Sequence, residues 1–161
     1  MQTAVTAPGL PARTPRLMLA IAVLAVFGVL VSSVSLYHHF ATSKTSFCDL
    51  GQSFNCDLVN RSEYSTLAGL PVALIGIAGY LVLLSLATVY REKAETPLLL
   101  LLASLAGLAF ALRLTYIEAR VLYAWCILCL SSLATILAIA VVSGLMLAAA
   151  TGSSRRMVSL I

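Results

Sequence analysis

Long apolar stretches separated by short polar ones dominate the chain. The first, Leu17–Leu36, contains no charged residue, and the others cover residues 67–90, 97–118 and 121–150. A membrane-spanning helix needs about 20 predominantly apolar residues, so each stretch is long enough to cross a bilayer. The pattern predicts an all-α integral membrane protein with a four-transmembrane-helix bundle, its spans at about 17–40, 67–90, 97–118 and 121–150.

The composition agrees with this pattern and excludes two classes of protein. The 161 residues are 61% hydrophobic and 10% charged, and the mean hydropathy is +1.03. Soluble domains carry about 45–50% apolar and about 25% charged residues. The chain therefore lacks the polar residues to cover a soluble enzyme, and it is too apolar for a disordered regulator. Its net charge of +4 bears on membrane topology, and we expect no nucleic-acid partner.

Residues 1–16 are rich in proline and carry Arg13 and Arg16, which is typical of a short basic tail. A signal peptide also begins with basic residues, but its apolar stretch is only about 7–15 residues long. The length of Leu17–Leu36 favours a first membrane helix. The triplet Ser33-Val34-Ser35 resembles a cleavage site and keeps the signal-peptide alternative open.

The distribution of lysine and arginine predicts the orientation. Four spans place both tails, 1–16 and 151–161, on one side. That side carries Arg13, Arg16, Arg91, Lys93, Arg155 and Arg156, and the other carries Lys44, Arg61, Arg113 and Arg120. The positive-inside rule therefore predicts a multi-pass protein of the cell inner membrane with cytoplasmic tails. The polar loop 41–66 and all four cysteines then lie on the outer, oxidising side.

The cysteines form two pairs with different spacing. Cys126 and Cys129 form a C-x-x-C motif at the start of the last apolar stretch, where a helix brings both sulfurs onto one face. The positive end of a helix dipole favours thiolate there, and thiolate is the reactive form in disulfide exchange. Cys48 and Cys56 lie on the polar loop with seven residues between them. Two such pairs predict a relay in which the loop pair exchanges with a protein partner and the C-x-x-C passes electrons to a quinone in the membrane.

Two other interpretations of the cysteines remain open. They are typical of two structural disulfides in an extracellular loop, in which case the chain is a non-enzymatic membrane subunit or scaffold. A C-x-x-C also suits tetrahedral zinc, but the wide spacing of Cys48 and Cys56 argues against a shared site, and we predict no metal.

Several polar residues near the cysteines have both a structural and a functional interpretation. Asn60 or Ser62 is expected to cap a helix beginning near Glu63, whereas beside the cysteines the Ser62 hydroxyl would donate a hydrogen bond to a quinone carbonyl. His38 and His39 are expected to anchor the first helix at the interface, with haem binding or proton transfer as the alternative.

Aromatic residues and one arginine complete the predicted outer end. Tyr64, Tyr116, Tyr123 and Trp125 fit an aromatic belt. Arg113 is expected to extend its side chain toward the interface, and its functional alternative is to hold a reduced, anionic quinone.

The order of these motifs resembles that of a known family. The segments are Cys48-Asp49-Leu50, Asn55-Cys56, Ser62, Tyr64, Gly69-Leu70-Pro71 and Trp125-Cys126-Ile127-Leu128-Cys129. Over about residues 17–150 they resemble a bacterial member of the vitamin K epoxide reductase family. The resemblance implies a four-helix membrane bundle around a quinone, with a periplasmic loop that carries a short helix over the mouth.

The resemblance also implies a role for each cysteine. Cys129 would meet the quinone (ubiquinone or menaquinone), and Cys126 would be its resolving partner, able to bridge to Cys56. Cys48 would exchange with a periplasmic thioredoxin-like (DsbA-type) thiol oxidase. The predicted quinone-binding residues are Ser62, Tyr64, Cys129 and Arg113.

The sequence departs from the family pattern in two places. Many bacterial members carry a fused thioredoxin-like domain, whereas this sequence stops near Ile161, so a separate partner chain is expected. Vertebrate members have a tyrosine four residues after the last cysteine, where this chain has Leu133, which argues against vitamin K epoxide as the substrate. In the DsbB family of quinone-coupled thiol oxidases the C-x-x-C precedes the spaced pair, so the order of the cysteines here favours the first family.

Overall fold

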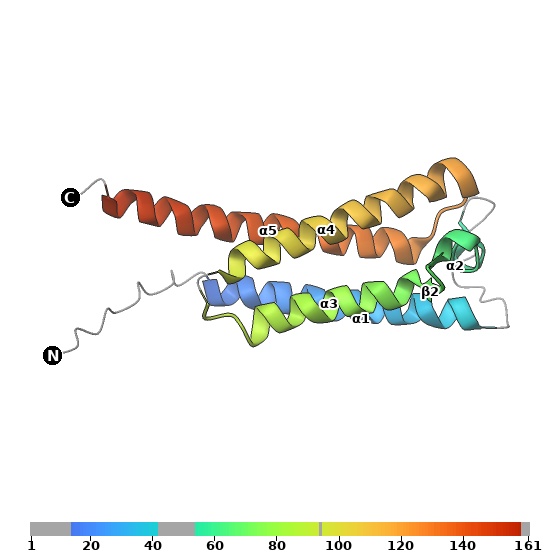
Figure 1. Ribbon diagram of the computed structural model, residues 1–161, viewed down its shortest axis with the longest axis horizontal. Helices are drawn as coiled ribbons and strands as arrows, with labels where there is room; N and C mark the ends of the chain where they lie inside the picture. Colours follow the sequence, from blue (N-terminus) through green and yellow to red (C-terminus); the bar gives the residue numbers. More distant parts are fainter. Residues whose placement is uncertain (1–13, 42–53, 94, 159–161) are drawn as a thin grey trace.

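The computed structural model describes residues 14–41, 54–93 and 95–158. Four long helices make up most of this part of the chain (Figure 1). They are α1 (Thr14–Phe40), α3 (Val72–Thr88), α4 (Thr96–Ile117) and α5 (Ile127–Val158). Within these residues, three helical segments are long and apolar enough to cross a membrane: Pro15–Phe40, Thr96–Leu122 and Ile127–Thr151. The prediction of a helical membrane protein is confirmed, while α3, with 17 residues, is shorter than the predicted second span.

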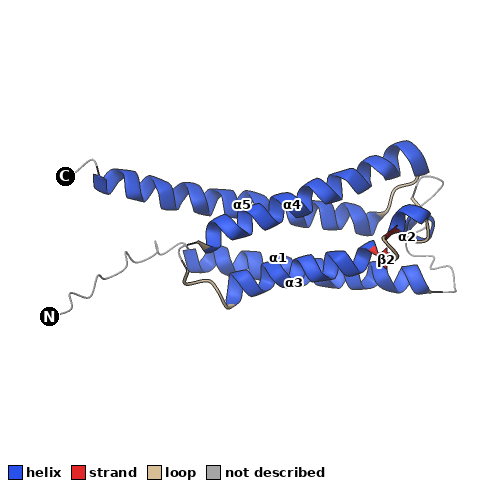
Figure 2. Ribbon diagram, viewed as in Figure 1, coloured by secondary structure: helices blue, strands red, loops and turns tan. Residues whose placement is uncertain are grey.

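The helices run lengthwise beside one another. Helix α1 packs against α3 and α5, and α4 packs against α5 and α3. The start of α1 and the end of α5 lie at one end of the bundle, together with the connection from α3 to α4 (Figure 1). The short helix α2 (Cys56–Asn60) lies at the opposite end (Figure 2).

The predicted second span begins later than expected because a small hairpin precedes it. After the 3₁₀ turn η2 (Glu63–Ser65), strands β1 (Thr66–Leu67) and β2 (Leu70–Pro71) pair antiparallel. Ala68 and Gly69, between the strands, have φ values of +51° and +82°, a backbone conformation that ends regular helix. Helix α3 therefore starts at Val72, directly after Pro71.

The predicted fourth span also begins later. A π-helical turn, η3 (Glu118–Leu122), follows α4, and Tyr123 then takes a left-handed conformation with φ of +50°. The chain next runs extended, and Trp125 forms a parallel bridge with Phe54. Helix α5 starts at Ile127, so Cys126 stands immediately before the helix and Cys129 lies in its first turn.

The helices bury a narrow apolar seam and leave large apolar side chains outside. The seam joins all four helices, through Met18, Ile21, Ala25, Tyr80, Leu83, Ala87, Leu100, Ile136, Ile139 and Met146. Small residues allow the close approach typical of membrane helices: a Cβ on Gly28 of α1 would lie 2.3 Å from the Tyr80 ring of α3. Outward-facing leucines and valines, such as Leu19 and Val89, suit a lipid environment.

Candidate functional site

Helix α2 is fastened to the segment that leads into the C-x-x-C motif. The Asn55 side chain caps α2 by accepting a hydrogen bond from the Leu58 N–H at 2.8 Å, and its own N–H donates to the Trp125 carbonyl at 3.1 Å. As a result, Cys56 and Cys126 belong to one buried cluster that also contains Val59 and Ala124. The structure thus brings together a loop cysteine and a cysteine of the C-x-x-C.

Cys126 occupies the cap position of α5. It is fully buried, and its carbonyl accepts the first helical hydrogen bond, from the Leu130 N–H at 3.0 Å. The Cys129 N–H points at the Cys126 sulfur, 3.4 Å away, as in an ordinary N-cap. The neighbouring Cys129 thiol, followed by the backbone N–H groups of the first turn, lowers the pKa of Cys126 against the opposing effects of burial and Glu118. Cys126 is therefore the more easily ionised thiol that exchange chemistry requires.

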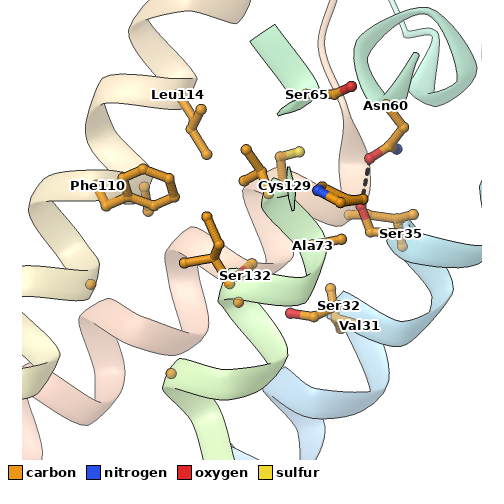
Figure 3. A pocket seen from close by; sticks show the side chains of 18 of the residues that line it. Val31, Ser32, Ser35, Asn60, Ser65, Ala73, Phe110, Leu114, Cys129 and Ser132 are labelled. Carbon is orange, nitrogen blue, oxygen red and sulfur yellow. Dashed lines mark hydrogen bonds between the residues drawn. The ribbon is translucent and has the colours of Figure 1, made fainter. Parts of the chain in front are cut away.

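Cys129 faces a cavity of about 360 Å³ that is lined by the four long helices together with residues of α2 and η2. The cavity walls are largely apolar and include Ala73 of α3 and Phe110 and Leu114 of α4 (Figure 3). Hydroxyl groups of Ser35 and Ser132 and the amide of Asn60 add polar atoms to its lining. An apolar chamber with a few polar groups is the usual form of a small-molecule site, and it suits a flat ring that carries carbonyl oxygens.

Asn60 connects the two cysteine-bearing segments, and the sequence analysis missed this role. Its side-chain nitrogen donates to the Cys56 carbonyl at 3.0 Å and lies 3.7 Å from the Cys126 sulfur. Its side-chain oxygen accepts from the Ser35 hydroxyl at 2.6 Å, drawn as the dashed line in Figure 3. Asn60 is thus the last residue of α2 and not a helix cap, and its buried amide holds α2 to both α1 and the C-x-x-C.

The two histidines at the end of α1 are not simple interfacial anchors. His38 is 1% exposed, and its Nδ1 lies 2.9 Å from an Asp57 carboxylate oxygen. His39 Nδ1 donates to the Asn60 carbonyl at 2.6 Å and lines the cavity. Both side chains fasten α1 to α2, directly beside Cys56. Nothing in the apolar pattern of α1 distinguished this use from an interfacial one.

The other predicted quinone-binding residues lie in different places. Ser62 and Tyr64 line the cavity beside Cys129. The Ser62 hydroxyl donates to the Val59 carbonyl at 2.8 Å and does not cap η2. Arg113 is exposed and does not line the cavity, so the structure does not bring it to the other three.

Glu118 is a further cavity residue that the sequence analysis passed over. It is 2% exposed, and one of its carboxylate oxygens, Oε2, accepts a hydrogen bond from the Cys126 N–H at 3.1 Å. A buried acidic residue in a membrane helix is a functional candidate. The available signal was an acidic residue eight positions before the C-x-x-C, the only one between Glu95 and the end of the sequence.

The three described cysteines are in two redox states. Cys126 and Cys129 are free thiols, whereas Cys56 forms a disulfide. Cys48, the predicted partner-facing cysteine, lies outside the described residues. Among the described residues, no three His, Cys, Asp or Glu side chains gather in a way that could hold a metal ion.

The chain is similar to a known protein family. The profile described as the Vitamin K epoxide reductase family matches residues 19–144, a range that contains all four cysteines and the whole cavity. The chain belongs to the vitamin K epoxide reductase family. Membership indicates a membrane thiol–quinone oxidoreductase, since enzymes of this family generally act on quinones. In this vitamin K epoxide reductase family protein, the cavity beside Cys129 is the candidate quinone site.

Proposed function

We propose that the protein relays electrons from a reduced thioredoxin-like, DsbA-type partner through two cysteine pairs to a quinone, and so supports disulfide-bond formation. The observation that carries the proposal is the position of the C-x-x-C. The Cys129 thiol faces the apolar cavity, whereas the Cys126 sulfur is buried in a cluster with Cys56. One sulfur is therefore beside the loop pair, and the other is beside the chamber for a lipid-soluble acceptor.

The first step reduces the loop pair, Cys48 and Cys56. A thiolate of the partner attacks the Cys48–Cys56 disulfide, one loop sulfur leaves as thiolate, and a mixed disulfide forms. The partner's second thiol then displaces the loop cysteine. The partner dithiol is oxidised to a disulfide, and Cys48 and Cys56 are reduced to thiols.

The second step moves the electron pair inward. The Cys56 thiolate attacks a Cys126–Cys129 disulfide at the Cys126 sulfur, and Cys129 leaves as thiolate. Cys48 then resolves the Cys56–Cys126 bridge, which restores the loop disulfide and leaves the C-x-x-C reduced. The lowered pKa of Cys126 makes it a good leaving group when that bridge is resolved.

The third step oxidises the C-x-x-C. Cys129 delivers electrons to the quinone in the cavity, and Cys126 closes onto Cys129 to form the disulfide. The dithiol loses two electrons and two protons, and the quinone, which becomes the hydroquinone, accepts both. Ser62 and Tyr64 line the same cavity and are proposed to orient the ring, with the Ser62 hydroxyl turning from the Val59 carbonyl toward a quinone oxygen.

The proposed location is the cell inner membrane, with both tails cytoplasmic and the cysteines on the periplasmic side. Helix α3 is proposed to span the membrane as well and so to complete the set of four spans, since its 17 residues are at the lower limit of about 17–25 for a transmembrane helix. A reporter fused after Ile161 is expected to be cytoplasmic. A periplasmic reporter would place the cysteines in a reducing compartment and contradict the relay.

The relay is tested by following the redox state of each cysteine in the purified full-length protein. The protein is reduced with a dithiol, mixed with a short-tailed quinone, and alkylated for peptide mass spectrometry. The relay predicts that Cys126 and Cys129 lose their alkylation when quinone is added. A membrane scaffold with two structural disulfides would instead show the same pattern with and without quinone, and that result would overturn the proposal.

A further inference from the structure

Glu118 has one carboxylate oxygen without a partner at the wall of the quinone cavity. Its Oε2 accepts from the Cys126 N–H, whereas its Oε1 is buried and has no hydrogen-bond partner within the described part of the chain. An unsatisfied buried polar atom costs about 1–3 kcal/mol. Fixing the Cys126 backbone needs only one acceptor, so the second oxygen is not explained by that structural role.

The local backbone is arranged around this residue. Glu118 opens the π-helical turn η3, a form of helix found often at functional sites. The left-handed Tyr123 turns the chain back, so that the Ala124 N–H donates to the Glu118 carbonyl at 3.3 Å. Both the backbone and the side chain of Glu118 are thereby tied to the segment that carries Cys126.

The carboxyl group lies between the C-x-x-C and the cavity. Its Oε2 accepts a hydrogen bond from the Cys126 N–H at 3.1 Å. It also lines the cavity that Cys129 faces. A carboxyl group that borders the same cavity as the reacting thiol has the position that proton transfer requires.

We propose that Glu118 is the proton carrier of quinone reduction: its carboxyl group takes the proton of the Cys129 thiol and gives it to a quinone oxygen. This inference rests on the proposed function. When Cys129 reduces the quinone, its S–H bond breaks and an O–H bond forms on Oε1 of Glu118; that bond then breaks as the proton passes to one oxygen of the reduced quinone. The proton that Cys126 loses on closing onto Cys129 goes to the other oxygen, which completes the hydroquinone. Glu118 returns to its starting state, and the dithiol supplies both electrons.

Three other titratable side chains border the cavity: His39, Tyr64 and Tyr80. His39 Nδ1 is held by the Asn60 carbonyl, and the Tyr80 hydroxyl is bonded to Ser132. Tyr64 is exposed. Arg113 and Arg120, the basic residues nearest in sequence, are both exposed. Among the cavity-lining residues that the structure describes, Glu118 is the only one with a carboxyl group.

The test is a single-turnover measurement with Glu118→Gln, which keeps an oxygen for the Cys126 N–H but cannot carry a proton. The protein is reduced, freed of excess dithiol, and mixed with a short-tailed quinone in a stopped-flow instrument. Loss of general acid–base catalysis slows a reaction by about 10²–10⁴-fold, so we expect at least a 100-fold slower reduction. Glu63→Gln is the matched control, because Glu63 is exposed and does not line the cavity.

The outcomes separate this inference from the proposed function. If the wild type does not reduce quinone, the proposed function fails. If the wild type does and Glu118→Gln matches it, only the role of Glu118 fails. Time-resolved infrared spectra of the wild type keep the test independent of the variant's folding: a carboxylic-acid carbonyl band should rise and then decay while the quinone is being reduced. A band that stays constant throughout the reaction would overturn the role.

Discussion

The side-chain nitrogen of Asn60 lies 3.7 Å from the Cys126 sulfur, and the same nitrogen donates to the Cys56 carbonyl at 3.0 Å. A single buried amide therefore spans the gap between the loop pair and the C-x-x-C. It fixes the relative position of two sulfurs that must come into contact if electrons are to pass between the pairs.

Replacing Asn60 with alanine should impair both folding stability and thiol exchange. The change leaves the buried Ser35 hydroxyl without its acceptor, which should lower the free energy of unfolding by about 1–3 kcal/mol. Transfer from the loop pair to the C-x-x-C should also slow, since α2 loses its tie to Cys126. Thermal unfolding in detergent and alkylation time courses measure the two effects. Ser33→Ala, which removes an exposed hydroxyl bonded within its own helix, should change neither.

The first thiol of the C-x-x-C to ionise, Cys126, should do so with a pKa below the ordinary value for cysteine, about 8.5. The Cys129 thiol is the largest cause of the lowered pKa of Cys126, so Cys129→Ala should move the first thiolate step to higher pH. A depressed pKa in the folded state contributes stability above the pKa of the unfolded chain, and this contribution is lost as the pH falls through the folded value.

The thiolate is followed by its ultraviolet absorbance, with Cys126→Ser as the blank that should lack this first step. An unmoved or lower midpoint in Cys129→Ala would contradict the assigned cause.

The contact between Gly28 and Tyr80 should make α1 intolerant of a larger residue there. A Cβ at Gly28 would lie 2.3 Å from the ring, and relieving such overpacking costs about 1–3 kcal/mol. Gly28→Ala should therefore lower the thermal midpoint in detergent. Gly144→Ala is the control, because its Cβ would meet only Leu101 at an ordinary 3.9 Å. Equal midpoints for the two variants would show that α1 and α3 do not pack as closely as described.

Filling the cavity should weaken quinone binding without affecting the loop pair. Ala73 lines the cavity, whereas Ala78 on the same helix is exposed and does not. Ala73→Phe should raise the KM for a short-tailed quinone by about tenfold or more, which corresponds to about 1.4 kcal/mol of binding free energy. Ala78→Phe should leave KM unchanged. A similar KM for all three proteins would place the quinone elsewhere.

The helical membrane architecture could be predicted because hydrophobicity over about 20 residues reflects the bilayer itself. The ends of the helices could not be predicted equally well. Residues 67–71 and 123–126 are as apolar as the helices they precede, yet positive φ values at Gly69 and Tyr123 turn them into a hairpin and an extended segment. Apolar composition does not distinguish helix from extended chain over so few residues.

The candidate site was only partly predictable for a related reason. The spacing of Cys126 and Cys129 indicates redox chemistry from the sequence alone, because residues three positions apart are separated by about one helical turn. Asn60 acts through a contact with Cys126 across the fold, and no local pattern marks such a contact. Glu118 was marked only by its charge, eight positions before Cys126. Arg113 shows the converse: its charge near a helix end was conspicuous, but its side chain is exposed and away from the cavity.

The role of Cys129 as the electron donor to quinone is tested most directly by reconstituting the full-length protein in lipid vesicles and measuring dithiol-dependent quinone reduction. The cavity-facing thiol predicts that wild-type protein accelerates the reaction and that Cys129→Ala lowers it to the rate of vesicles without protein. Quinone reduction by Cys129→Ala at the wild-type rate would contradict the account.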